Sequence, residues 1–511
     1  MGKSRPQIVA TVVPNSDAMA SQKAASDGGG GADGGGVQLR RELGLWSAVS
    51  LIVGVMIGSG IFVSPTSALE RSGSVGLCLI IWAVCGGISL LGALAFAELG
   101  AVVPRSGAEY AYFIEAFGKL HPFWGPLPSF VCAWVYVMVL RPAEVAVIVL
   151  TFSQYVSQPF EEAFQVEMDL EHRQLVLKLI ALVALGLMTY INIVSVKLYV
   201  RVQNVFTACK LIACFVVICG GLYALINGQT QNLSKGFEGS STDPKSIALA
   251  FYSGLWAYDG WSTVTSVTEE VKRPERNILW SIAIGVPVVT VVYCFMNLSY
   301  MTVLSIPEMI AAPAVAVEFG DRMLGVFKFI IPLGVALSTF GCALSIQFGV
   351  TRLCFVAAQE GHMVSALSFI HFRRLTPAPA VTLQGILTAF FILAGDIVDL
   401  IDFSSFLIWI FYGGAMVALL VLRKSRPKAH RPYRVPLIIP LLVMVVAIFL
   451  AVVPIAMDPS PKYLIAVFFI FTGVIVYIPF VYYKKHPKIL GRFTEWIQKL
   501  MEVVPADNNT S

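Results

Sequence analysis

Two short stretches rich in glycine and polar residues interrupt apolar segments of this chain. One is Gly58-Ser59-Gly60, and the other runs from Trp256 through Asp259 to Gly260. A helix that breaks inside a membrane offers free N–H groups at one end and free carbonyl groups at the other. Free N–H groups suit a carboxylate, and free carbonyls suit an ammonium group. The two stretches together therefore predict a mid-membrane site for an amino acid zwitterion in a secondary transporter.

The residue types at each break indicate the contacts to expect. Glycines beside Ser59 let backbone N–H groups reach a carboxylate because no Cβ stands in the way. Carbonyls near Trp256, Ala257 and Asp259 are expected to accept from the ammonium group. An acid such as Asp259 costs about 2.5–3.5 kcal/mol at the centre of a membrane helix, so it should face water or substrate. Two alternatives stay open: Trp256 is a lid or an interfacial aromatic, and Gly54 with the glycine four residues later also suits plain helix packing.

The surrounding sequence is typical of a membrane protein. Hydrophobic residues make up 57% and charged residues 13% of the 511 residues, whereas a soluble protein carries about 25% charge. Apolar runs of about 20 residues, long enough to cross about 30 Å of hydrocarbon, recur along the chain. These runs are continuous and not alternating, which predicts an all-α membrane protein and not a barrel. We predict twelve membrane helices, at 45–68, 76–102, 127–153, 174–195, 201–226, 246–268, 279–304, 324–356, 379–396, 400–422, 436–456 and 462–483.

These helices define a transporter domain at 45–483, flanked by two tails. The first tail, 1–44, should be disordered because its segment 28–36 is nearly all glycine. The second, 484–511, is expected to be a cytoplasmic tail. Lysine and arginine gather in alternate loops, which places both termini in the cytoplasm. The net charge of +5 thus reflects topology, and we expect a lipid bilayer around the protein and no nucleic acid partner.

A few further residues lie in unusual surroundings. Lys210 lies deep in an apolar run, where it either snorkels to the surface or acts as an internal cation or proton-binding amine. Arg141 and Glu144 share a helix face, which suits a structural ion pair or a gate. Asn232 begins a glycosylation sequon in a predicted outer loop. The sequence shows no catalytic triad, phosphate-binding loop or metal-ligand cluster, so we expect neither an enzyme, a cofactor nor a metal.

Several longer motifs carry a resemblance to a known family. They are Ile57-Gly58-Ser59-Gly60-Ile61-Phe62-Val63, Ser106-Gly107-Ala108-Glu109-Tyr110, Val202-Gln203-Asn204-Val205-Phe206, Gly254-Leu255-Trp256-Ala257-Tyr258-Asp259-Gly260-Trp261 and Leu375-Thr376-Pro377-Ala378-Pro379-Ala380. Over about 40–505 the chain resembles the light subunits of heteromeric amino acid transporters, of L-type and b(0,+)-type, in the amino acid–polyamine–organocation superfamily. The resemblance implies a leucine-transporter-type fold of twelve helices, with a five-plus-five inverted repeat and breaks in helices 1 and 6. It also implies sodium-independent exchange of L-amino acids by alternating access.

The resemblance also places the site and a partner. The matching substrate positions are Ile57, Ser59, Gly60, Ile61, Trp256, Ala257 and Asp259, with Trp256 as an aromatic gate. Lys210 matches a helix 5 lysine that stands where sodium-coupled relatives hold sodium. The stretch 262–267 departs from the family pattern, which leaves the substrate open. The loop at 154–173 lacks the cysteine that links relatives to a single-span heavy-chain glycoprotein, so we expect non-covalent pairing or a transporter that works alone.

The expected function is sodium-independent transport or exchange of L-amino acids at the plasma membrane. Neutral substrates fit, and cationic ones stay open because Asp259 can balance a positive side chain. Two alternatives share the fold: a uniporter or exchanger for large neutral amino acids, and a proton-coupled symporter.

Overall fold

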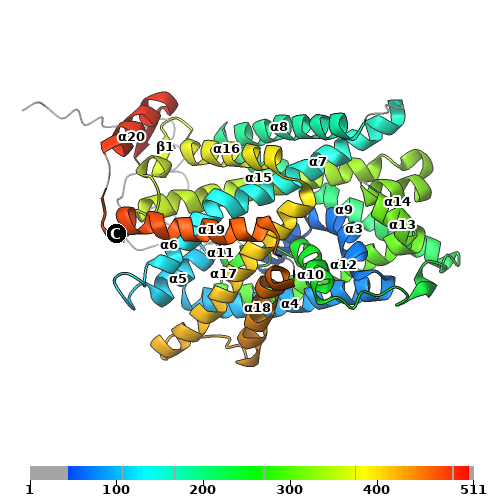
Figure 1. Cartoon of the computed structure of the whole chain (residues 1–511), viewed down its shortest axis with the longest axis horizontal. Helices are drawn as coiled ribbons and strands as arrows, with labels where there is room; N and C mark the ends of the chain where they lie inside the picture. Colours follow the sequence, from blue (N-terminus) through cyan, green and yellow to red (C-terminus); the bar gives the residue numbers. More distant parts are fainter. Residues whose placement is uncertain are drawn as a thin grey trace, which may run out of the picture. The chain divides into compact units, whose positions relative to one another are not determined.

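The computed structural model describes residues 44–105, 107–164, 169–194, 196–266, 268, 271–312, 314–374, 376–457, 459–485 and 488–505. Helices account for most of this part of the chain (Figure 1). Apart from Gly44, the predicted disordered tail at 1–44 lies outside the described residues.

The first predicted membrane helix is broken. Helix α2, Leu45–Met56, and helix α3, Gly60–Ser72, meet at a 50° bend and together are long and apolar enough to form one span. Between them, residues 57–59 leave the helical pattern, and the N–H of Gly58 donates to the carbonyl of Met56 at 2.7 Å. The glycine-rich sequence therefore produces the predicted break.

The second predicted break is also present. Helix α10, Pro244–Ala257, is capped by Asp243, whose carboxylate accepts from the N–H of Ser246 at 3.0 Å. The chain then turns through residues 258–262 before the short helix α11, Thr263–Ser266. Gly260 has a φ of 110° in this turn, a conformation that glycine adopts at little cost.

The remaining long helices correspond to the other predicted spans. They are α4 (Val75–Val102), α6 (Leu127–Val135) with α7 (Arg141–Phe164), α8 (Leu170–Val194), α9 (Val196–Ile226), α12 (Pro274–Val303), α15 (Ile330–Gln359), α16 (Ala378–Ala394), α17 (Ile397–Ser425), α18 (Ile438–Met457) and α19 (Pro461–Tyr477). Within the described ranges, nine helices have the length and hydropathy of a span, or ten with the α2–α3 pair. The other two predicted spans are α16, which has 17 residues, and the broken α10–α11 segment. The prediction of a multi-pass, all-helical membrane fold is confirmed.

Several shorter elements connect or follow the spans. They are α5 (Glu109–Phe117), α13 (Ile306–Ala311), α14 (Val315–Met323), α20 (Lys488–Met501), and strands β1 (Phe369–His371) and β2 (Val503–Pro505). The two strands pair antiparallel, with Ile370 opposite Val504. The segment predicted as a C-terminal tail thus contains a helix and a strand that packs on the α15–α16 connection.

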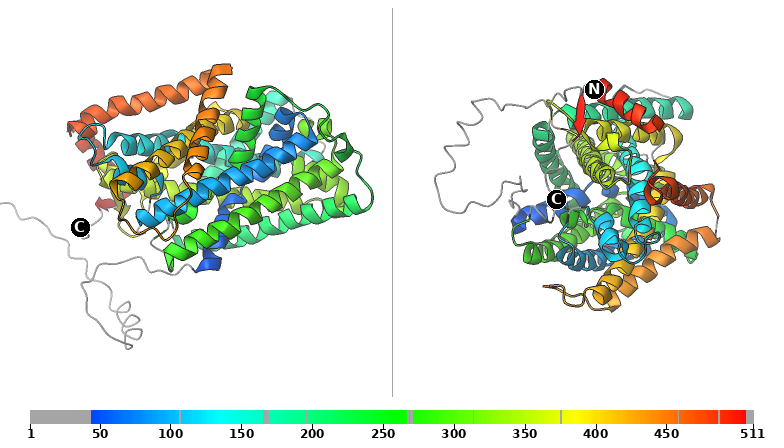
Figure 2. Two further views of the ribbon diagram at one scale, coloured as in Figure 1. Left: turned by 90° about the horizontal axis from the view of Figure 1, so that it is seen from below. Right: turned by 90° about the vertical axis from the view of Figure 1, so that its left-hand side faces the viewer.

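The broken helices lie inside the bundle. Helix α3 packs along α10, and α12 packs against both α2 and α4. Figure 2 shows α4 and α12 running side by side. Most buried apolar side chains of the two breaks join one continuous core cluster, so the surrounding helices hold the interrupted backbone in place.

Candidate functional site

The two breaks contact each other directly. A Cβ added to Gly60 would lie 2.4 Å from the Cα of Ala257, and one added to Gly260 would lie 2.7 Å from Cγ1 of Val55. Real Cβ atoms do not approach backbone as closely as 2.4 Å, so position 60 requires glycine. At position 260 the near atom belongs to a side chain, and the φ of 110° is what favours glycine there. The structure therefore brings together the two stretches that the sequence predicts to form one site.

The predicted contact residues divide into two groups by exposure. Ile57, Ser59, Gly60, Ile61 and Ala257 are buried. Trp256 and Asp259 are partly exposed. No side chain caps the N-terminus of α3 at Ser59 within the described chain, which leaves the positive end of that half-helix for another partner.

A tyrosine hydroxyl lies at the carbonyl ends of both half-helices. The oxygen of Tyr293, on α12, is 2.5 Å from the carbonyl oxygen of Met56 and 2.9 Å from that of Ala257. A hydroxyl has one proton to donate, so the two carbonyls share one donor. Tyr293 is not among the residues predicted from the sequence, and nothing in the apolar run around it marks it as special.

Asp259 belongs to a charged cluster. The hydroxyl of Tyr412, on α17, donates to Oδ1 of Asp259 at 2.5 Å. Its Oδ2 lies 3.7 Å from Nη1 of Arg141. Arg141 in turn pairs with Glu144 at 2.6 Å and lies 5.1 Å from the centre of the Tyr136 ring. The ion pair that the sequence predicts between Arg141 and Glu144 is therefore part of the site.

A π-helical turn positions this cluster. Residues Tyr136–Leu140 form the turn between α6 and α7, directly before Arg141. Such turns are rare and are frequent at functional sites.

A narrow cavity borders the cluster. Its lining residues are Glu144, Leu255, Trp256, Asp259, Trp261, Ser405, Ile408, Trp409 and Tyr412. Its volume is about 10 Å3, the space that one water needs. Ser59 and Gly60 do not line it, because α3 packs straight onto Ala257. The site is therefore closed around its polar groups in this conformation.

Lys210 is internal, as one of the two sequence alternatives predicts. Its side chain is on α9 and is 2% exposed, and Nζ donates to the carbonyl of Gly54. Gly54 belongs to α2, shortly before the break. The terminal nitrogen of Lys210 thus lies against the first broken helix.

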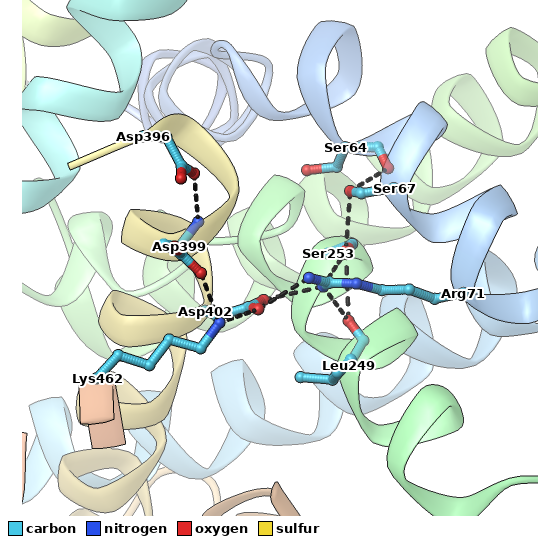
Figure 3. A network of polar contacts seen from close by, with 9 residues as sticks. All are labelled: Ser64, Ser67, Arg71, Leu249, Ser253, Asp396, Asp399, Asp402 and Lys462. Atoms are coloured by element: carbon cyan, nitrogen blue, oxygen red, sulfur yellow. Dashed lines mark hydrogen bonds and ion pairs between the residues drawn. The ribbon is translucent and has the colours of Figure 1, made fainter. Parts of the chain in front are cut away.

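A second polar network links α3 and α10 to α17 and α19 (Figure 3). Arg71 makes two parallel bonds to Asp402, at 2.8 and 2.9 Å, and also donates to Ser253 and to the carbonyl of Leu249. Lys462 contacts Asp402 at 2.9 Å and Asp399 at 2.8 Å. The sequence alone does not predict this set, which we call the Arg71 network.

Other features lie away from the breaks. A larger cavity of about 580 Å3 lies beside α4 and α12 and includes Arg273, Arg276 and Tyr433 in its lining. It shares no residue with the narrow cavity. We place the candidate site at the breaks because the free helix ends and the charged side chains lie there.

Asn232 is half-buried and donates to the carbonyl of Thr302 at 3.3 Å. No group of three or more His, Cys, Asp or Glu residues suits a metal in the described ranges.

Comparison with known proteins identifies the family of the chain. The family model described as Amino acid permease matches residues 43–480. The human b(0,+)-type amino acid transporter 1 is 44% identical over 92% of this chain and 94% of its own length. The human Cystine/glutamate transporter is 40% identical over 92% of both chains. The human Large neutral amino acids transporter small subunit 2 is 40% identical over 93% of this chain and 87% of its own.

These matches test the family resemblance that the motifs carry. The relatives span the light-subunit types that the sequence resembles, so that prediction is confirmed, as is the prediction of a transporter and not an enzyme. The family match covers most of the chain, including both broken helices. The chain belongs to the amino acid permease family.

Proposed function

We propose that this protein exchanges L-amino acids across a membrane by alternating access and without sodium. The observation that carries the proposal is the contact of the two helix breaks at Gly60 and Ala257, next to Asp259. The positive end of α3 and the carbonyl ends of α2 and α10 meet there, and a zwitterion needs both kinds of group.

Each predicted contact has a role in this proposal. Backbone N–H groups around Ser59, Gly60 and Ile61, with Ile57 beside them, bind the carboxylate. Carbonyls near Trp256 and Ala257 accept from the ammonium group, and Asp259 adds a negative charge. Trp256, which lines the cavity next to Asp259, closes over the substrate. Opening the packed contact between α3 and α10 then admits the substrate.

Lys210 supports the sodium-independent part of the proposal. Its ammonium group occupies a position against the Gly54 carbonyl where a cation stabilises the break. A fixed cation there removes the need for a bound ion. The proton-coupled alternative would need uptake that follows a pH gradient.

The positions of charges and cysteines support a proposal for the orientation and the partner. We propose that both termini are cytoplasmic and that the protein works in the plasma membrane, with Asn232 on the outer side as a glycosylation acceptor. The nine cysteines lie outside segment 154–173, so pairing with a heavy-chain glycoprotein, a property of heteromeric transporters, would be non-covalent.

Exchange in proteoliposomes tests the function. Vesicles preloaded with leucine should take up labelled leucine faster than empty ones, equally in sodium and in choline. Asp259→Ala should abolish uptake, whereas Glu70→Ala, an exposed acid on α3, should not. Full uptake by Asp259→Ala, or uptake only in sodium, would contradict the proposal.

A further inference from the structure

Arg141, the cation of the cluster that also contains Glu144 and Asp259, already pairs with an acid of its own helix. Arg141 and Glu144 lie one turn apart on α7, with Nη1 and Oε2 2.6 Å apart. Glu144 lines the narrow cavity together with Trp256 and Asp259. Its side chain is 3% exposed, so this carboxylate lies in the interior.

Arg141 is enclosed on several sides. The Tyr136 ring lies 5.1 Å from its guanidinium, and Oδ2 of Asp259 is 3.7 Å from the same Nη1 that binds Glu144. Glu144 is the close partner and Asp259 the distant one. Asp259 has a second contact of its own, with the hydroxyl of Tyr412.

The formal charges in this cluster do not cancel. Two carboxylates face one guanidinium, and the buried Glu109 on α5 is a third acid close enough to act on both Arg141 and Asp259, so net negative charge lies beside the cavity. A substrate with an anionic side chain would meet net negative charge and find Arg141 already engaged. A neutral side chain meets no such penalty, and a cationic one is attracted.

We propose that Glu144 determines specificity by occupying Arg141, so that the site rejects amino acids with an anionic side chain. This inference rests on the proposed function and names the substrate class that its site excludes. Without Glu144, the guanidinium retains the longer contact with Asp259 and the contact with the Tyr136 ring. It can then bind a side-chain carboxylate, because arginine presents several donors in a planar fork.

A competition assay with paired amino acids tests the inference. Labelled leucine uptake into leucine-loaded proteoliposomes is challenged with glutamate or glutamine, which differ in charge but hardly in size. Arginine and citrulline form the matching cationic pair. In the natural sequence, glutamine should inhibit and glutamate should not. In Glu144→Gln, the inhibition constant of glutamate relative to glutamine should fall by about tenfold or more, the ratio that about 1.4 kcal/mol produces.

Two further variants test whether the gain in glutamate inhibition depends on the guanidinium of Arg141. The double variant Arg141→Gln/Glu144→Gln should lose the glutamate inhibition that Glu144→Gln gains. Glu161→Gln is the matched control, because Glu161 lies on the same helix and pairs with Arg173 at 2.8 Å but does not line the cavity. It should leave every inhibition constant unchanged.

The outcomes separate this inference from the proposed function. Failure of the natural sequence to exchange leucine would contradict the function itself. Leucine exchange by Glu144→Gln without any gain in glutamate inhibition would overturn the inference alone. If that variant folds but does not transport, thermal stabilisation of the purified protein by glutamate against glutamine gives the same comparison. If it does not fold, Glu144→Asp, which draws the carboxylate back by one methylene, should show part of the gain, and its absence would overturn the inference.

Discussion

Gly60 and Ala257 touch through their backbones, with no room for a methyl group between them: a Cβ at Gly60 would lie 2.4 Å from the Cα of Ala257. We predict that Gly60→Ala abolishes leucine exchange and lowers the free energy of unfolding by about 1–3 kcal/mol, the usual cost of overpacking. Gly87→Ala is the control, since a Cβ there meets nothing within 4 Å. Normal exchange by Gly60→Ala would show that the two breaks need not touch.

Tyr293 lies between the carbonyls of Met56 and Ala257 and gives a second prediction. Tyr293→Phe removes the one donor that these two half-helix ends share. The loss should cost about 1–3 kcal/mol, because a buried acceptor is left unsatisfied. We expect a lower thermal midpoint and slower leucine exchange. An unchanged exchange rate would mean that the hydroxyl only fills space.

The Arg71 network predicts unequal effects for two neighbouring acids. Asp402 has a 1% exposed side chain and contacts both Arg71 and Lys462, whereas Asp399 is 60% exposed and contacts Lys462. Asp402→Asn leaves a largely buried guanidinium without its carboxylate and should cost about 3–5 kcal/mol. Asp399→Asn should cost less than about 1 kcal/mol. Equal losses in a thermal unfolding assay of the two variants would contradict this assignment.

His362 predicts how stability depends on pH. It follows α15, and its Nδ1 lies 3.0 Å from the hydroxyl of Tyr110 on α5. Burial lowers its pKa from 6.5 to about 4. The folded protein therefore binds fewer protons than the unfolded chain between these values, so stability falls as pH drops from 6.5 towards 4. Above pH 6.5 the histidine is neutral in both states and has no effect.

A single substitution measures this contribution. Between pH 7 and pH 4, His362→Gln should lose about 1–3 kcal/mol less stability than the natural sequence loses. Thermal midpoints at several pH values report the change. His172→Gln is the control because its side chain is 74% exposed. The same acid sensitivity in His362→Gln and the natural sequence would place the titrating group elsewhere.

Lys210 gives a prediction about ions. Its Nζ donates to the carbonyl of Gly54 beside the first break. Lys210→Ala removes the internal cation, so uptake should fall and the remainder should respond to sodium. Uptake in sodium against choline measures this. Full uptake in both media would show that the break is stable without any cation.

Local sequence signals were sufficient to predict the breaks. The Gly58-Ser59-Gly60 run and the pairing of Asp259 with Gly260 are unusual together in one membrane protein, because an acid is costly in a membrane helix, and each signal lies within a few residues. The Arg71 network was not predictable in this way. Arg71 and Asp402 are 331 residues apart in sequence, and only the folded bundle brings them together. Tyr293 is a similar case, because its role depends on two backbone carbonyls from other helices.

Hydropathy also set the wrong limits for some elements. The predicted third span ends at 153, but α7 continues to Phe164, because polar residues near its end lower the hydropathy without breaking the helix. Helix α20 was expected as part of a tail. Its apolar residues Phe493, Trp496, Ile497 and Leu500 repeat with helical spacing. The charged residues on its other face lower the mean hydropathy, so a search for membrane spans does not find it.

A structure of the protein bound to leucine tests the central claim most directly. The account predicts density for the leucine backbone at the two breaks, with its carboxylate at the N–H groups of residues 59–61 and its ammonium group at the carbonyls of residues 256–259. Leucine bound elsewhere, for example in the cavity lined by Arg273 and Arg276, with Gly60 still packed on Ala257, would contradict it.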